Sequence, residues 1–103
     1  MKLTDFESKA LEKIKEIPEG KVSSYKKLAR AIGFPEAARA VGNALHKNPR
    51  LIRVPCHRIV KNDGSLGGYA GGAKKKTALL KKEGVRFEGG KIINFKENLY
   101  RFR

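Results

Sequence analysis

The chain has one side chain that is a strong nucleophile by type, Cys56, and two basic residues, His57 and Arg58, follow it directly. A cysteine reacts as its thiolate, and a neighbouring base or positive charge raises the thiolate fraction by lowering the thiol pKa. This cluster therefore suggests a nucleophilic Cys56 with His57 as its base. The alternative is a buried and inert thiol, which is the usual state of an isolated cysteine.

His57 needs help from the fold for this role. Neighbouring residues of a strand point to opposite faces, so contact between Cys56 and His57 requires a bridging water or a turn at Pro55. An orienting partner must also fix the tautomer of His57. Among the downstream carboxylates, Glu83 ends an otherwise cationic helical segment, against the helix dipole. Glu83 is therefore a candidate partner, although a surface pair with lysine would also explain it.

Length and composition limit the possible classes of protein. A chain of 103 residues with 40% hydrophobic residues fits one small domain. One cysteine excludes an intramolecular disulfide, and one cysteine with two histidines makes a structural zinc site unexpected. No apolar run approaches the roughly 18 residues of a membrane span, and no secretory signal is visible. We expect a cytoplasmic protein without cofactor or metal.

The net charge of +14 is unevenly spread. Residues 1–20 carry a net −1, residues 21–73 a net +8 and residues 74–103 a net +7. A strongly basic surface is typical of proteins that bind a polyanion, most simply nucleic acid. General solubility, or the lysine enrichment of a heat-adapted protein, is the alternative.

Helical spacing and capping residues predict three helices in the first half of the chain. The first carries a capping box of Thr4 and Glu7, and the second spans residues 25–32 behind Ser23 and Ser24. We expect Pro35 to open a third helix over residues 36–46. Two short helices around a glycine turn form a helix-turn-helix pattern.

The second half of the chain is more irregular. An apolar run at residues 51–54 is compatible with a strand, and residues 61–72, with five glycines, must form a loop. A basic helix is expected over residues 74–83, followed by a hairpin of residues 85–87 and 91–93. The last ten residues are expected to fray.

The third predicted helix carries Arg39 among very small residues, namely Ala37, Ala38, Ala40, Gly42 and Ala44. A helix that reads base edges in the major groove needs several long polar side chains. Arg39 and Asn43 are the main ones here, which favours shallow, shape-based contact. Tight packing against another helix explains the small residues equally well.

The sequence VPCHRIV at residues 54–60 resembles the active-site signature of the O6-alkylguanine-DNA alkyltransferases, the methylated-DNA–protein-cysteine methyltransferases. The resemblance covers about residues 6–93. It includes GKVSSY at residues 20–25, AARAVG at 37–42, Asn48-Pro49, the glycines and Tyr69 of the loop, Lys76, and Glu83-Gly84.

This resemblance implies DNA repair. A guanine alkylated at O6 in double-stranded DNA is flipped out of the helix, and Cys56 takes its alkyl group in one irreversible turnover. Position by position, His57 acts as base through a water, Glu83 orients His57, and Asn48 holds the turn that presents Cys56. Tyr25 donates to the departing guanine and presses on the 3′ phosphate.

The resemblance also assigns a DNA surface and a base pocket. Arg39 fills the space left by the flipped base. The minor-groove face would consist of Ala37, Ala38, Ala40, Gly42 and Asn43. The base pocket would be shaped by Val54, Pro55, Ile59, Tyr69, Ala70 and Gly71.

The expected fold is a helix-rich α/β single domain over residues 1–103, with a winged helix-turn-helix core and a short sheet or hairpin. We expect a monomer without the N-terminal domain that many family members carry. Ala70 stands where relatives often have serine or a larger residue, which leaves the range of alkyl groups open. Two alternatives remain. One is a non-catalytic, alkyltransferase-like binding module, a class that has tryptophan in place of Cys56. The other is a cysteine hydrolase, which needs a thiolate–imidazole pair and an oxyanion hole.

Overall fold

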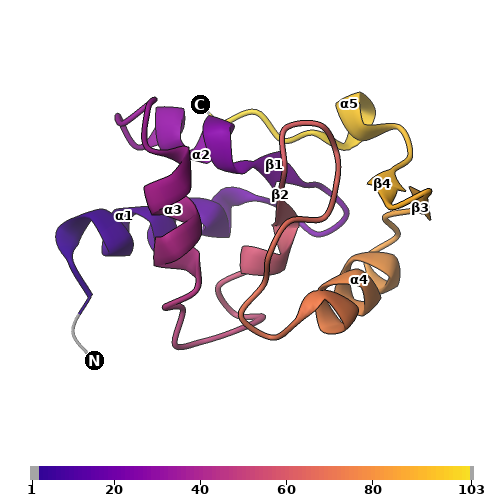
Figure 1. Ribbon diagram of the computed structural model, residues 1–103, viewed down its shortest axis with the longest axis horizontal. Coiled ribbons are helices and arrows are strands. Elements are labelled where there is room, and N and C mark those ends of the chain that lie inside the picture. The colour runs from indigo at the N-terminus through magenta and orange to yellow at the C-terminus, as the bar shows by residue number, and fades with distance from the viewer. Residues whose placement is uncertain (1–2, 103) are drawn as a thin grey trace.

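The computed structural model describes residues 3–102, and its helices lie around a small central sheet (Figure 1). Helix α1 (Asp5–Lys13) begins at the predicted capping box, in which Thr4 and Glu7 bond to each other's backbone N–H groups. It continues into a 3-10 turn, η1 (Ile14–Glu16). Ala10, Leu11 and Ile14 point into the core, so the predicted amphipathic helix is confirmed.

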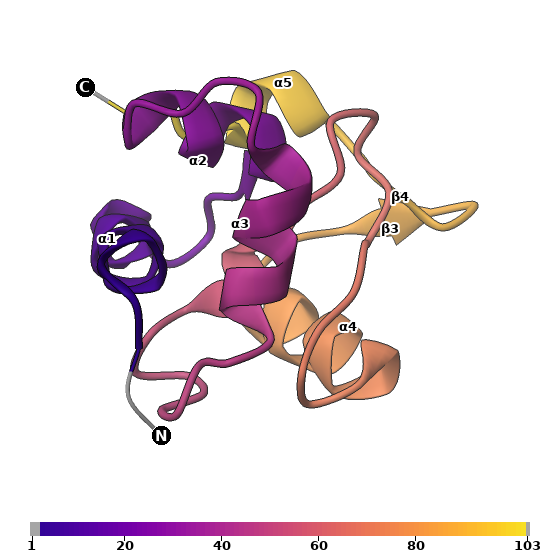
Figure 2. The same cartoon turned by 60° about the vertical axis from the view of Figure 1, so that its left-hand side comes forward.

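The helix-turn-helix pattern is present as α2 (Tyr25–Ala31) and α3 (Ala38–Leu45), with Ser24 capping α2. The prediction that Pro35 opens the third helix is wrong. Residues 34–37 form a turn instead, because Phe34 N–H bonds to the Ala29 carbonyl and Ala37 N–H to the Phe34 carbonyl. Helix α3 therefore starts at Ala38, and its exposed face forms one side of the molecule (Figure 2).

The central sheet is a parallel pair, β1 (Ser23–Ser24) with β2 (Ile59–Val60). The predicted strand at residues 51–54 does not form. Val54 N–H bonds to the Arg50 carbonyl, and Leu51 faces Val54 across a tight loop rather than a neighbouring strand. Another 3-10 turn, η2 (Cys56–Arg58), joins this loop to β2.

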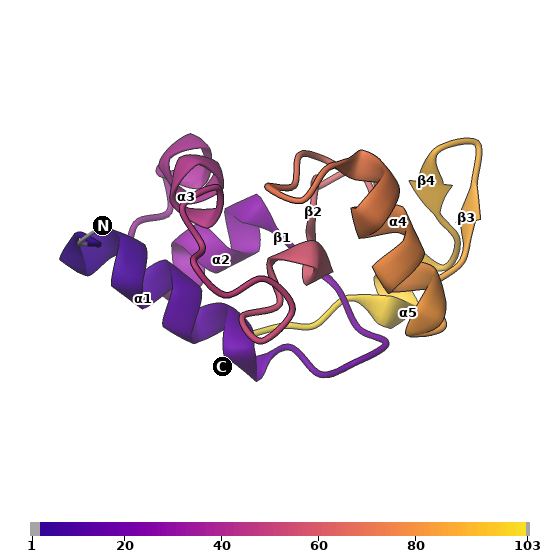
Figure 3. The ribbon, with the colours of Figure 1, turned by 90° about the horizontal axis from the view of Figure 1, so that it is seen from below.

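The predicted loop at residues 61–72 lies between β2 and α4 (Ala73–Lys82). The predicted hairpin is also confirmed, as β3 (Phe87–Glu88) paired antiparallel with β4 (Lys91–Ile92). Seen from below, α4 and the hairpin lie on the opposite side of the central sheet from α1 and α3 (Figure 3).

Residues 94–102 do not fray, and the last residue of the predicted ten lies outside the described residues. After α5 (Phe95–Asn98), Val22 pairs with Leu99. Tyr100 N–H donates to the Val22 carbonyl at 2.6 Å, and Ser23 Oγ donates to the Tyr100 carbonyl at 2.9 Å. The prediction failed because polar, basic residues suggested solvent contact, whereas the aromatic rings of Tyr100 and Phe102 pack against the core.

Two clusters of buried residues stabilise this arrangement. The larger lies under α1, α2 and α3 and includes Cys56 and Tyr69; the smaller lies between β2, α4 and the hairpin. The chain is thus a helix-rich α/β domain, as expected, with Cys56 between its two halves. None of the helices within residues 3–102 is both long enough and apolar enough to cross a membrane.

Candidate active site

The loop before Cys56 is held by the side chain of Asn48, which is 8% exposed. Its Nδ2 donates to the Val54 carbonyl and to Cys56 Sγ, both at 2.9 Å, while its Oδ1 accepts from Arg50 N–H at 2.8 Å. Within the loop Ile52 has a φ of +79°, which is costly for a β-branched residue. Asn48 therefore forms hydrogen bonds to both ends of a strained loop and to the thiol of Cys56.

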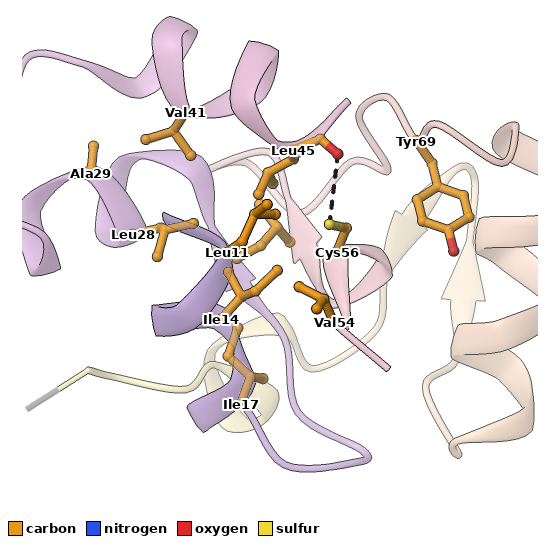
Figure 4. Packing of buried hydrophobic residues seen from close by; sticks show 11 residues of the cluster. Leu11, Ile14, Ile17, Leu28, Ala29, Val41, Leu45, Val54, Cys56 and Tyr69 are labelled. Atoms are coloured by element: carbon orange, nitrogen blue, oxygen red, sulfur yellow. Dashed lines mark hydrogen bonds between the residues drawn. The ribbon is translucent and has the colours of Figure 1, made fainter. Parts of the chain in front are cut away.

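A turn at Pro55 sets the direction of Cys56. With φ −81° and ψ 64°, Pro55 lies in an inverse γ-turn that is closed by a bond from Cys56 N–H to the Val54 carbonyl. The next three residues form η2, so Cys56 and His57 are not on opposite faces of a strand. Cys56 Sγ nevertheless accepts from Asn48 Nδ2 and not from His57. It also donates to the Leu45 carbonyl (Figure 4).

The thiol of Cys56 is 4% exposed, and its surroundings favour the neutral form. Burial raises its pKa to about 11, and the Asn48 hydrogen bond and the charge of Lys76 offset only part of that rise. The expectation of a lowered thiol pKa is therefore wrong for this structure. The basic residues next to Cys56 in sequence do not compensate for the loss of solvent.

Glu83 joins the two residues that follow Cys56. Its Oε2 lies 2.8 Å from His57 Nε2 and from Arg58 Nη2, and its Oε1 accepts from Arg58 Nε at 2.9 Å. Burial raises the pKa of Glu83, but the hydrogen bonds from Arg58 and His57 outweigh it and leave the pKa lowered. Arg58 also donates to the Ile17 carbonyl, so this ion pair connects α4 with η1.

His57 is completely buried, and burial lowers its pKa although Glu83 acts in the opposite direction. Its other ring nitrogen, Nδ1, has no hydrogen-bond partner among the described residues. With Nε2 bonded to Glu83, the neutral ring carries its proton on Nε2 and leaves Nδ1 as a free acceptor. The arrangement suits a base whose tautomer is set by a carboxylate.

A narrow cavity of about 10 Å³ opens beside Cys56. Its walls come from α2, α3 and the glycine-rich loop, and they consist of Tyr25, Gly42, Leu45, His46, Cys56, Gly68, Tyr69 and Ala70. Tyr69 and Ala70 were predicted here. The predicted pocket residues Val54 and Ile59 lie in the larger core cluster instead, and Pro55 and Gly71 do not line the cavity.

A broader groove of about 350 Å³ continues from the cavity across the outer face of α3. It shares Tyr25, Gly42, His46 and Gly68 with the cavity and adds Ala38, Arg39, Asn43, Lys61 and Gly67. The side chains of Arg39 and Asn43 are exposed. Five residues predicted to contact DNA, Tyr25 among them, thus meet in one groove, while Ala37 and Ala40 lie outside it.

Sequence reasoning gave no part in the site to four residues. Leu45 and His46 follow Gly42 by three and four positions, and this helical spacing predicts that all three share a face. Gly68 and Lys76 meet only in the folded chain, where Lys76 Nζ donates to the Gly68 carbonyl at 2.9 Å. Within residues 3–102, no group of three or more His, Cys, Asp or Glu side chains is placed to hold a metal ion.

Comparison with known proteins identifies the family of the chain. The family model for the DNA-binding domain of 6-O-methylguanine DNA methyltransferase matches residues 5–85, so the chain belongs to that family. A methylated-DNA–protein-cysteine methyltransferase of Methanosarcina acetivorans is 47% identical over 81 residues, which are 79% of this chain and 52% of the relative. The chain spans about half the length of the first curated relatives that it matches.

Two solved structures extend the comparison. A Mycobacterium tuberculosis OGT in complex with DNA is 46% identical, with a TM-score of 0.78 over 81% of this chain and 51% of that chain. Schizosaccharomyces pombe Atl1, in complex with damaged DNA containing O6-carboxymethylguanine, is 31% identical, with a TM-score of 0.84 over 98% of this chain and 99% of that chain.

Proposed function

We propose that this protein repairs DNA by moving an alkyl group from O6-alkylguanine in a duplex to Cys56. The observation that carries the proposal is a nucleophilic residue at the end of a cavity that continues into the exposed groove of a helix-turn-helix. The names of the relatives, and the DNA bound in two solved structures, support the same substrate.

In this reaction the sulfur of Cys56 forms a bond to the alkyl carbon as the bond from that carbon to O6 breaks. The proton of the thiol passes to Nδ1 of His57 through a water, and the departing guanine takes a proton in exchange from a donor such as Tyr25. Glu83 stabilises the imidazolium that forms. The thioether product is stable, so each protein molecule reacts once.

DNA binding would use the groove on α3. Flipping a base costs a few kcal/mol of stacking and pairing, and the cost is lower at a damaged pair. An inserted side chain offsets part of this cost, and Arg39 is the long, exposed side chain placed to do so. The net charge of +14 supplies affinity for phosphates that is independent of sequence, as a search for rare lesions requires.

Binding of damaged DNA without alkyl transfer is the second candidate, because Atl1, which was solved in complex with damaged DNA, is similar over nearly the whole of both chains. Burial raises the pKa of Cys56 and so disfavours the reactive thiolate, which favours a binding role without alkyl transfer. A cysteine hydrolase fits less well, since Cys56 bonds to Asn48 and Leu45 while His57 bonds to Glu83, and no thiolate–imidazole pair forms.

The deciding experiment is the mass of the intact protein after incubation with a duplex containing one O6-methylguanine. We expect a gain of one methylene unit, confined to the peptide that contains Cys56, in a single stoichiometric step. An unchanged mass together with selective binding of the damaged duplex would support the non-catalytic role. Repeated turnover of an ester would support the hydrolase.

A further inference from the structure

Lys76 is a buried cation whose charge acts on the pKa of Cys56 but to which the proposed reaction assigns no bond or proton transfer. Its side chain is 0% exposed, and it forms no salt bridge among the described residues. Burying an ammonium group is costly unless hydrogen bonds compensate. Burial lowers the pKa of Lys76 to about 8. A side chain kept at this cost is expected to have a specific task.

The ammonium group of Lys76 donates to a backbone carbonyl, and the same carbonyl accepts a hydrogen bond from Tyr25. Gly68 O accepts from Lys76 Nζ at 2.9 Å and from Tyr25 Oη at 3.2 Å. The ammonium also lies 5.8 Å from the centre of the Tyr25 ring, within the range of a cation–π interaction. One oxygen thus joins α2, α4 and the glycine-rich loop, and both of its lone pairs are used.

Ser65 of this loop pairs with Lys91, and Tyr69 packs in the larger core cluster, but the segment between them has few backbone attachments. Within the described chain, Leu66, Gly67 and Gly68 make no backbone–backbone hydrogen bond, and the loop's own bonds lie toward its ends, as in Gly64 to Lys61 and Gly72 to Tyr69. The approach to Tyr25 is close, because a Cβ on Gly67 would stand 2.9 Å from the Tyr25 hydroxyl. Glycine therefore allows this contact but does not secure it.

This loop is the movable wall of the cavity beside Cys56. The other walls come from α2, α3 and η2, which have regular secondary structure, whereas the loop packs against the larger core cluster through Tyr69. A cavity of about 10 Å³ holds roughly one water molecule, so a purine enters only if a wall moves. The loop between β2 and α4 is the wall without regular secondary structure (Figure 1).

We propose that Lys76 is a positioning residue that keeps this loop closed over Cys56 through the Gly68 carbonyl, and that an entering base opens the pocket by separating that carbonyl from Tyr25. The hydroxyl of Tyr25 then becomes free to donate to an acceptor on the purine. Closure in the free protein needs no DNA, so this part is independent of the proposed function; the opening step rests on it.

Hydrogen exchange of the free protein tests the closure. Lys76→Met keeps an unbranched side chain of similar length and removes the donor, and Lys74→Met removes an equal charge from an exposed site on α4. We expect amides of residues 66–70 to exchange about tenfold faster in Lys76→Met, as the loss of a hydrogen bond to a charged group implies. Exchange in α1 should stay unchanged, and Lys74→Met should match the parent. Equal exchange in the parent and Lys76→Met would overturn the proposal.

A double-mutant cycle distinguishes action of Tyr25 and Lys76 through one shared carbonyl from independent effects of the two residues on the loop. If Tyr25 and Lys76 close the loop through the same oxygen, Tyr25→Phe and Lys76→Met will have non-additive effects on loop exchange. Additive effects would contradict the shared acceptor. This result does not depend on whether Cys56 reacts.

The opening step is tested with the Cys56→Ser protein, which cannot react, on two duplexes that differ only in one O6-methylguanine. We expect the damaged duplex to change the hydrogen exchange of residues 66–70, and the undamaged duplex to leave it unchanged. Equal behaviour with both duplexes would refute opening by a base. Failure of methyl transfer in the parent, with closure intact, would refute the proposed function alone.

Discussion

The two sides of the cavity beside Cys56 differ in how they are held. On the side of the thiol, Asn48 bonds to three backbone or side-chain atoms, and Glu83 binds both His57 and Arg58. On the opposite side the loop residue Gly68 is held by two side-chain donors at one carbonyl. The first side resists movement, and the second can open by losing two hydrogen bonds.

This difference assigns separate tasks to the two sides. A nucleophile needs a fixed direction of attack, because small displacements of reacting atoms cost much of the rate. Entry of a base needs a wall that moves at low cost. Burial raises the pKa of Cys56, so the surroundings of the thiol in this structure favour its neutral form.

The largest expected effect comes from removing the nucleophile on the fixed side. Cys56→Ser should abolish methyl transfer, measured by intact mass, because a serine hydroxyl is a far weaker nucleophile at neutral pH. Affinity for duplex DNA, measured by fluorescence anisotropy, should change by less than about 0.5 kcal/mol, as for substitutions away from the contact surface. Equal loss of transfer and binding would contradict the separation of tasks.

The next effect concerns the stability of the fixed side. Glu83→Ala leaves the charge of Arg58 and the ring of His57 without their partner, and we expect a loss of about 3 kcal/mol in the free energy of unfolding. Urea denaturation measures this loss. Glu88→Ala, in the exposed hairpin, serves as the control and should be neutral. Similar values for both variants would show that the Glu83 network does not hold this side.

A smaller effect is expected in the groove that leads to the cavity. Arg39→Ala should slow repair of a damaged duplex about tenfold, the effect of losing roughly 1.4 kcal/mol of assistance to base flipping. Reaction with free O6-benzylguanine, which requires no flipping, should keep its rate. Arg30→Ala removes the same charge from an exposed position on α2 and is the matched control. Equal slowing with both substrates would remove Arg39 from the flipping step.

The smallest effect is the pH dependence of stability. Because burial lowers the pKa of His57 in the folded state, the unfolded chain binds more protons below the ordinary value of 6.5, and stability falls as the pH drops through that value. Glu83, whose pKa is also lowered, adds a second loss below its ordinary value of 4.5. Urea denaturation between about pH 8 and pH 5 should show a flatter profile for His57→Gln than for the parent. An unchanged profile would exclude His57 as the source of the pH dependence of stability.

Local features of the sequence predicted much of the fold. The capping box of Thr4 and Glu7, the cap at Ser24, the glycine-rich loop and the hairpin depend on residues only a few positions apart. Local rules failed near the end of the chain, where Tyr100 bonds to the distant Val22. They also failed at Pro35, because hydrogen bonds within residues 29–37 form a turn in place of a helix start.

The candidate site divides in the same way. The resemblance placed Cys56, His57, Glu83 and Asn48 together, and the hydrogen bonds among them agree with that grouping. Their roles in the reaction stay predictions. The resemblance included Lys76 but gave it no role, and its burial comes from the packing of α4 against Tyr25 and the loop.

By itself the sequence determined the family, the candidate nucleophile, the excess of positive charge and many of the short-range elements, because these depend on residue types and near neighbours. The tertiary structure decided how deeply the thiol is buried, the direction of its pKa shift, which residues line the cavity and which carbonyl holds the loop. Desolvation and hydrogen-bond geometry are sums over atoms brought from remote parts of the chain. Nearness in sequence therefore could not reveal that Cys56, beside two basic residues, has a raised pKa.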